Sequence, residues 1–200
     1  MIDEPEEITR KKYEWLTKNH ARYGSGFHGR GYIPFLRSLN HNSIIDIGTG
    51  HGEMCRGLSP YYKEVYGLDW VIEPLPEIKA IKNITFLKSE AWRIPLPDKS
   101  VDILTSFDFF EHVLTSKVEA VLTEMTRVTR VGMLHKICFD KKSGSRREQL
   151  EQEFGDGELH LTARSINEYW KPLFKNKFSI DKNRTEPGMY KVNGALYIII

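Results

Sequence analysis

The sequence predicts an α/β domain of three layers, in which helices cover both faces of a mostly parallel, seven-stranded sheet that ends in a C-terminal antiparallel hairpin. Short, nearly continuous apolar runs alternate with helical stretches along most of the chain. This alternation is typical of a parallel sheet buried on both faces. The last two apolar runs lack a helical stretch between them, which indicates the hairpin.

The 200 residues contain no internal repeat and no linker rich in Pro, Gly or Ser. A chain of this length is long enough to bury one full core. We therefore expect a single domain over residues 1–200, with a helical and glycine-rich cap over 1–40 and the core over 41–200.

The predicted strands are apolar or β-branched runs bounded by turn residues. They cover residues 43–47, 64–68, 84–87, 101–105, 133–139, 178–180 and 196–200. The first five alternate with helical stretches, so they should run parallel. The last two should form the hairpin at the sheet edge.

Helices are expected over residues 6–19, 53–58, 113–128 and 165–174. The stretch 113–128 carries apolar residues at three- and four-residue spacing, which is the helical period. Ser165 is predicted to cap its helix, with Glu168 at the capping-box position. Helix 6–19 should lie over the sheet as an extra helix, and the glycine-rich, aromatic segment 23–32 should be mobile.

Composition indicates a soluble globular protein, with 40% hydrophobic and 28% charged residues. No apolar run approaches the roughly 20 residues that span a bilayer, and the acidic N-terminus lacks an apolar signal-peptide core. We expect a cytoplasmic protein, a monomer or homodimer, with no membrane partner. The net charge of +2 does not indicate nucleic acid, although the basic stretch 141–147 is either a solvated loop or a contact for an anionic acceptor.

The cysteines, Cys55 and Cys138, are too few for a disulfide framework or a cysteine-based metal site. Both are expected to be small buried apolar side chains. The sequence therefore predicts no metal site.

Residues 46–53, Asp-Ile-Gly-Thr-Gly-His-Gly-Glu, lie where the first predicted strand leads into a helix. Open α/β sheets bind ligands at such a point. Gly48, Gly50 and Gly52 let the backbone bend and approach a ligand closely. Their spacing differs from the dinucleotide fingerprint, whose third glycine comes three residues after the second.

Asp46 precedes this loop, and Thr49 lies within it. A carboxylate there would repel a pyrophosphate but can serve a cationic ligand. S-adenosylmethionine carries a sulfonium and an ammonium and has no phosphate. The loop therefore favours S-adenosylmethionine over NAD, which stays the rival cofactor.

Asp69 ends the second predicted strand, and Trp70 follows it. A carboxylate at that strand tip can accept hydrogen bonds from both ribose hydroxyls, and Trp70 can pack against an adenine face. The alternative for Asp69 is an exposed turn residue.

Two further segments carry a family resemblance. Residues 89–102 resemble the class I methyltransferase pattern of an acidic residue, a small residue, a Leu-Pro-like turn and a Val-Asp strand start. Residues 106–113, Ser-Phe-Asp-Phe-Phe-Glu-His-Val, resemble that family's strand end and its Glu-His-Val entry to the next helix. With the glycine loop, the match covers residues 43–139, and the chain resembles the class I (Rossmann-like) methyltransferases, in particular the methyltransferase type 11 family.

The resemblance implies a Rossmann-like fold, S-adenosyl-L-methionine as methyl donor and S-adenosyl-L-homocysteine as product. It implies that Glu90 accepts a hydrogen bond from the adenine amino group, that the backbone amide of Ala91 meets a ring nitrogen, and that the backbone carbonyl of Phe107 holds the methionine ammonium. Glutamate replaces the family's commoner aspartate at position 90, which allows a longer reach or a shifted adenine.

An oxygen or nitrogen acceptor that is protonated at neutral pH also needs a base. The candidates are His160, His112, Asp108 and Glu111. His160 follows the fifth predicted strand, on the expected acceptor side. For His112, orienting the cofactor loop is the alternative to catalysis.

The favoured acceptor is a small molecule or sugar-like metabolite, because the chain adds no obvious nucleic-acid or protein-binding domain. An RNA ribose 2′-O-methyltransferase is the alternative. Asp108, Lys136 and Glu168 loosely match part of its Lys-Asp-Lys-Glu set, but the first lysine has no counterpart. A non-catalytic S-adenosylmethionine-binding protein also stays open.

Overall fold

The computed structural model describes residues 6–20, 29–71, 73–138, 146–162, 166–173, 178–180 and 193–199. The predicted α/β class is confirmed. Within these residues one seven-stranded sheet has the order β3-β2-β1-β4-β5-β7-β6. The strands are β1 (Ser43–Ile47), β2 (Glu64–Asp69), β3 (Ile84–Lys88), β4 (Val101–Phe107), β5 (Thr129–Cys138), β6 (Phe178–Ile180) and β7 (Asn193–Ile199).

Strands β1 to β5 pair in parallel, with β1 between β2 and β4. Ile45 lies opposite both Tyr66 of β2 and Leu104 of β4. Strand β7 runs antiparallel to β5 and to β6. The antiparallel pairing of β6 and β7 fits the predicted hairpin, but the connection between the two strands lies outside the described residues. Position 200, the end of the predicted last strand, also lies outside them.

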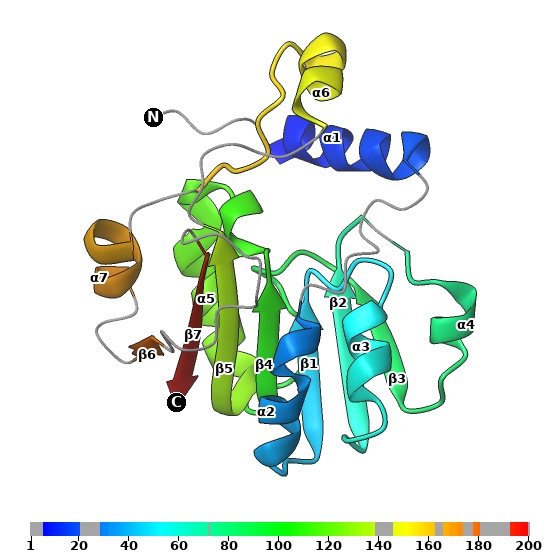
Figure 1. Ribbon diagram of the computed structural model, residues 1–200, viewed down its shortest axis with the longest axis vertical. Coiled ribbons are helices and arrows are strands. Elements are labelled where there is room, and N and C mark those ends of the chain that lie inside the picture. Colours follow the sequence, from blue (N-terminus) through cyan, green and yellow to red (C-terminus); the bar gives the residue numbers. More distant parts are fainter. Residues whose placement is uncertain are drawn as a thin grey trace.

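The α-helices are α1 (Glu6–Asn19), α2 (Ile33–Ser38), α3 (Glu53–Leu58), α4 (Pro76–Lys79), α5 (Val118–Val128), α6 (Arg147–Phe154) and α7 (Lys171–Leu173). Short 3₁₀ turns are η1 (Arg30–Tyr32), η2 (Phe110–His112) and η3 (Thr115–Lys117), and η4 (Ile166–Trp170) is π-helical. Helices α2 and α3 lie over one face of the sheet and α5 over the other (Figure 1). No helix among the described residues is long and apolar enough to cross a membrane.

Both faces of the central strands are buried, as the continuous apolar runs predict. Every residue of β1 and β4 is buried. Neighbouring side chains alternate between two cores: Ile44 packs with α2 and α3, whereas Ile45 packs with α5. Because a strand alternates its side chains between faces, one apolar run supplies both cores.

Three expectations about helices need correction. The helix predicted over 113–128 begins at Val118, because Val113 and Leu114 are extended and the η3 turn precedes the helix. The described part of segment 165–174 is η4 followed by α7, and Ser165 lies outside the described residues. Helix α1 does not cover a face of the sheet but crosses the edge where the parallel strands end (Figure 1).

The fifth strand and the cysteines also differ in part from expectation, while residues 23–28 of the glycine-rich segment lie outside the described residues. In the segment 23–32 the described residues form the η1 turn, where the ring of Tyr32 stacks on Phe107 with centroids 5.5 Å apart. The fifth strand begins at Thr129 rather than Met133. Cys55 is buried, but Cys138 is only half-buried. Most of the basic stretch 141–147 lies outside the described residues, and Arg147 begins α6.

Asp102 ties the starts of three adjacent strands together. Its Oδ2 accepts hydrogen bonds from the backbone N–H groups of Asn42 and Ser43, each at 3.1 Å, and from the Ser43 hydroxyl at 3.2 Å. Its Oδ1 accepts from Nε and Nη2 of Arg130, at 2.9 and 2.6 Å. One carboxylate on β4 thus anchors β1 and β5.

Replacing Asp102 with alanine should therefore lower the free energy of unfolding by about 2–4 kcal/mol, because several partly buried donors lose their acceptor. Chemical denaturation measures the change. The matched control is Asp98→Ala, whose side chain is 76% exposed in its ion pair with Arg127. That control should change stability by about 1 kcal/mol or less. Equal effects of the two substitutions would show that Asp102 does not anchor the strands.

Candidate functional site

The candidate site lies at the edge of the sheet where the parallel strands end. Parallel strands bring all their carboxyl ends to one edge, so the loops after β1, β2, β3 and β4 meet there. Helix α1 crosses this edge (Figure 1). The sequence-predicted residues for cofactor binding lie on these loops or on the adjoining strand ends.

The glycine loop after β1 needs glycine for steric reasons. Gly48, Gly50 and Gly52 have φ of +72°, +54° and +89°, in the left-handed region that disfavours other residues. A Cβ at Gly48 would lie 2.7 Å from the ring of Phe109, and one at Gly52 would lie 2.8 Å from the ring of Phe86. The loop is therefore packed closely against two aromatic side chains.

Asp69, at the end of β2, holds this loop. Its Oδ2 accepts a hydrogen bond from the backbone N–H of Gly50, and its Oδ1 accepts one from Val71, each at 3.0 Å. The backbone N–H groups of Gly48 and Thr49 also donate to the carbonyl of Leu68, at 2.8 and 3.1 Å. Asp69 is thus more than an exposed turn residue, because it joins the glycine loop to the tip of β2.

Asp46 lies below the glycine loop with only 3% of its surface exposed. Its Oδ1 accepts a hydrogen bond from the Thr105 hydroxyl at 2.9 Å. Burial raises the pKa of Asp46 to about 7, which hydrogen bonds from Thr105 and Thr49 only partly oppose. A nearby positive charge would favour its ionised form.

Trp70 and Glu90 both contact helix α1. The guanidinium of Arg10 lies 5.0 Å from the centre of the Trp70 ring, and its Nη2 donates to Glu90 Oε1 at 2.8 Å. Tyr13 also lies edge-on to Trp70, with centroids 6.4 Å apart. The neighbouring Ala91 is buried.

Arg10 and Tyr13 also lie at the candidate site, although no sequence motif pointed to them. They lie on α1, far from every motif in the chain. The sequence feature that could have indicated them is the helix itself, because its apolar and aromatic side chains have to pack against another part of the protein.

At the end of β4, Phe107 is nearly buried and stacks on Tyr32. Asp108 follows with φ of +49°, a conformation that aspartate tolerates better than most residues. Its Oδ2 accepts from Lys136 Nζ at 3.1 Å, and the Lys136 side chain is buried. Glu168, the other residue of the loosely matched set, is exposed on η4.

His112 and His160 lie side by side, with ring centroids 5.0 Å apart. Nδ1 of His112 donates to the carbonyl of Leu159 at 2.9 Å, since a carbonyl can only accept. Burial, with repulsion from His160, lowers the pKa of His112 to about 4. His112 therefore stays neutral at neutral pH, with its one ring proton on Nδ1. The hydrogen bond to Leu159 favours the alternative in which His112 orients its loop. His160 is partly exposed.

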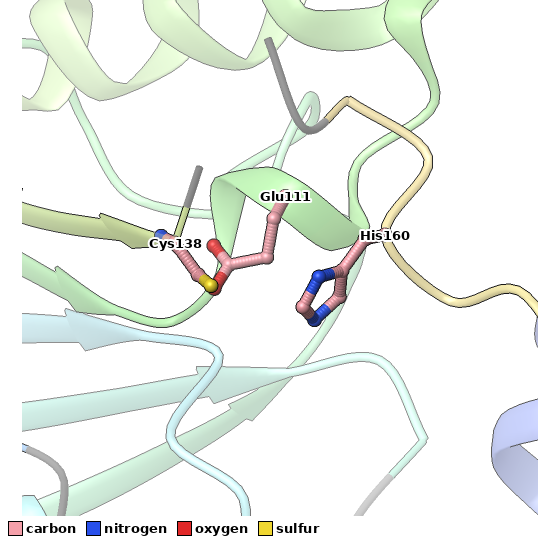
Figure 2. Close-up of side chains that lie close together, drawn as sticks. All are labelled: Glu111, Cys138 and His160. Carbon is pink, nitrogen blue, oxygen red and sulfur yellow. The ribbon is translucent and has the colours of Figure 1, made fainter. Parts of the chain in front are cut away.

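His160 also belongs to a group that the sequence did not predict. Ligand-type atoms of Glu111, Cys138 and His160 all lie within 4.8 Å of one another (Figure 2). Burial, helped by the negative charge of Asp108, raises the pKa of Glu111 to about 8. These residues come from separate segments of the chain, so their spacing carries no motif.

Sequence comparison finds that the central part of the chain is similar to a known family. Residues 45–134 match the methyltransferase type 11 family, described as a methyltransferase domain. An uncharacterized methyltransferase of Bacillus subtilis, YcgJ, is 31% identical over 93 residues, which cover 44% of this chain. The match spans only 36% of that protein's length.

Solved structures share the fold over almost the whole chain. Magnesium protoporphyrin IX methyltransferase from Synechocystis PCC 6803, crystallised with S-adenosylhomocysteine, is 13% identical with a TM-score of 0.68, covering 96% of this chain and 97% of that one. A SAM-dependent methyltransferase from Aquifex aeolicus is 20% identical with a TM-score of 0.57, covering 98% of each chain. The Rossmann-like fold of such methyltransferases is confirmed.

The buried Asp46 makes stability depend on pH. Its pKa of about 7 exceeds the ordinary value of 3.8, so between these values the native state binds more protons than the unfolded state. The free energy of unfolding should then fall as pH rises through this window. Asp46→Asn keeps an acceptor for Thr105 but cannot ionise. Relative to the parent, it should gain about 1–3 kcal/mol of stability between about pH 5 and pH 8.

Urea unfolding at several pH values tests this expectation. Asp98→Asn, at an exposed position, is the control and should show no such trend. A stability difference between Asp46→Asn and the parent that stays constant with pH would contradict it.

Proposed function

We propose that this chain, whose residues 45–134 match the methyltransferase-domain family, is an S-adenosyl-L-methionine-dependent methyltransferase. It moves the methyl group to an oxygen or nitrogen atom of an acceptor and releases S-adenosyl-L-homocysteine. The observation that carries the proposal is the glycine loop, held to Asp69 at the carboxyl edge of a parallel sheet. That edge is where open α/β sheets bind ligands.

The cofactor would lie along this edge. Each Asp69 oxygen already accepts one backbone N–H, and a carboxylate oxygen has a further lone pair for a ribose hydroxyl. Trp70 offers apolar surface to the adenine, the backbone amide of Ala91 would meet a ring nitrogen, and Glu90 can accept from the amino group. Arg10 of α1 donates a hydrogen bond to Glu90 and packs on the Trp70 ring. Arg10 would therefore have to move away from both side chains when the adenine binds.

The methionine end would lie near Asp46, Thr49 and the carbonyl of Phe107. Asp46 is buried with a raised pKa. A cationic ligand nearby would lower that pKa and stabilise the ionised carboxylate. A pyrophosphate at the same place would be repelled. This charge argument favours S-adenosylmethionine over NAD.

For the acceptor we propose a small molecule or sugar-like metabolite. Helix α1 lies over the cofactor edge (Figure 1), an arrangement that suits a compact acceptor better than a long polymer. His160 is the proposed proton acceptor. The other candidates already have partners, since His112 donates a hydrogen bond to the carbonyl of Leu159 and Asp108 forms an ion pair with Lys136.

Calorimetry with S-adenosylhomocysteine and with NAD tests the cofactor. We expect the former to bind and the latter not. Asp69→Ala should weaken binding of S-adenosylhomocysteine by about 1.5–3 kcal/mol, the range for hydrogen bonds to a charged group. The control is Glu64→Ala, at the opposite, exposed end of the same strand. Unchanged affinity in a folded Asp69→Ala protein would contradict the assignment.

Incubation of acceptor pools with isotopically labelled methyl donor tests the reaction. Small-molecule pools should become labelled. His160→Ala should slow transfer by about 10²–10⁴-fold, the usual contribution of a general base, while its affinity for S-adenosylhomocysteine stays unchanged.

Two other results of this experiment count against the proposal. Labelling of RNA alone would favour the ribose 2′-O-methyltransferase. Cofactor binding without transfer to any pool would favour a non-catalytic binding protein.

A further inference from the structure

Three side chains with different donor atoms converge beside the proposed acceptor side. Glu111 lies on η2, Cys138 ends β5, and His160 lies on the loop after α6. In Figure 2 the imidazole of His160 and the Cys138 sulfur both approach the carboxylate of Glu111. One oxygen, sulfur or nitrogen atom from each residue lies within 4.8 Å of the other two.

The carboxylate of Glu111 provides a second, independent observation. Glu111 is completely buried. Its Oε1 accepts a hydrogen bond from the backbone N–H of Cys138 at 3.2 Å. Its Oε2 is buried and has no hydrogen-bond partner among the described residues. Leaving a buried carboxylate oxygen unpaired costs free energy, and a cation between the three side chains would remove that cost.

We propose that Glu111, Cys138 and His160 form a binding site for a divalent transition-metal ion of the zinc class. Zn²⁺ takes thiolate, imidazole and carboxylate ligands together, whereas Mg²⁺ and Ca²⁺ require oxygen ligands. A thiolate in the set therefore selects the softer ion. Three protein ligands leave a fourth tetrahedral position open, the arrangement of catalytic rather than structural zinc sites.

The dimensions and charges suit such an ion. Zinc–ligand bonds of about 2.0–2.3 Å put tetrahedral ligand atoms about 3.3–3.8 Å apart. With all three atoms within 4.8 Å of one another, the cluster has to contract by at most about 1–1.5 Å to hold the ion. Cys138 and His160 are only partly buried, which gives an ion an approach from solvent. The positive charge of Lys136 is balanced by its ion pair with Asp108, so it adds little repulsion of a cation. Glu111 and Cys138 would become negative ligands by releasing their protons as the metal ion binds.

The metal site stands on its own geometry, but its meaning for catalysis rests on the proposed methyl transfer. An acceptor oxygen in the open position would lose its proton more readily, since a bound zinc ion lowers the pKa of an oxygen ligand. His160 would then act as a metal ligand rather than as the general base.

Titration of the metal-free protein with Co²⁺ tests the site without any methyl-transfer assay. Co²⁺ reports a bound thiolate through a sulfur-to-cobalt charge-transfer band in the near ultraviolet. We expect one Co²⁺ per chain, the band, displacement of Co²⁺ by Zn²⁺, and no displacement by excess Mg²⁺. Absence of the band, or displacement by Mg²⁺, would overturn the proposal.

Substitutions identify the ligands. Glu111→Gln keeps the size of the buried side chain and an acceptor for the Cys138 N–H. Cys138→Ser and His160→Ala change partly exposed positions. Each should weaken Co²⁺ binding by at least about 10–100-fold, the loss seen even for residues that only support a ligand.

His41→Ala, at the opposite end of β1 from the site, is the control and should bind Co²⁺ like the parent. Circular dichroism checks that each variant is folded. Folded variants with parental Co²⁺ affinity would overturn the metal site, while the calorimetric test of S-adenosylhomocysteine binding would still decide the proposed function separately.

Discussion

The parallel pairing of β1 with β2 on one side and β4 on the other is the constraint on which the rest of the structure depends. Because these strands run in the same direction, every loop that follows them emerges at one edge. Asp102 holds the opposite ends of β1, β4 and β5 in register. The glycine loop, Asp69 and the group of Glu111, Cys138 and His160 can therefore lie at the same edge although long stretches of sequence separate them.

Burial at that edge shifts ionisable groups in opposite directions. It raises the pKa of the carboxyl groups of Asp46 and Glu111 to about 7 and about 8, and lowers that of the His112 imidazole to about 4. Each shift favours the neutral form. A site built from neutralised carboxyl groups is prepared for cations, because an incoming positive charge is offset by release of a proton. The proposed sulfonium cofactor and the proposed metal ion both meet this condition.

Helix α1 joins the N-terminal part of the chain to the candidate cofactor site. Through Arg10 and Tyr13 it contacts Trp70 and Glu90, and Lys12 reaches Asp156 beyond α6 at 3.1 Å. The helix was predictable from propensity, but its position was not, since an amphipathic helix can cover a sheet face or a sheet edge equally well. Here the faces are already covered by α2, α3 and α5, so α1 covers the edge.

Local sequence determined the parallel strands, the glycine loop and the carboxylate that follows β2, because apolar runs, glycine spacing and strand ends are properties of neighbouring residues. It also predicted a helix before Val128 but placed its start too early, since a helical period does not reveal that Val113 and Leu114 are extended. Only the tertiary structure decided that Arg10 meets Glu90, and that Glu111, Cys138 and His160 converge while Cys138 stays half-buried. Those contacts join residues far apart in the chain, and their geometry depends on how β5 and the loop after α6 pack against η2.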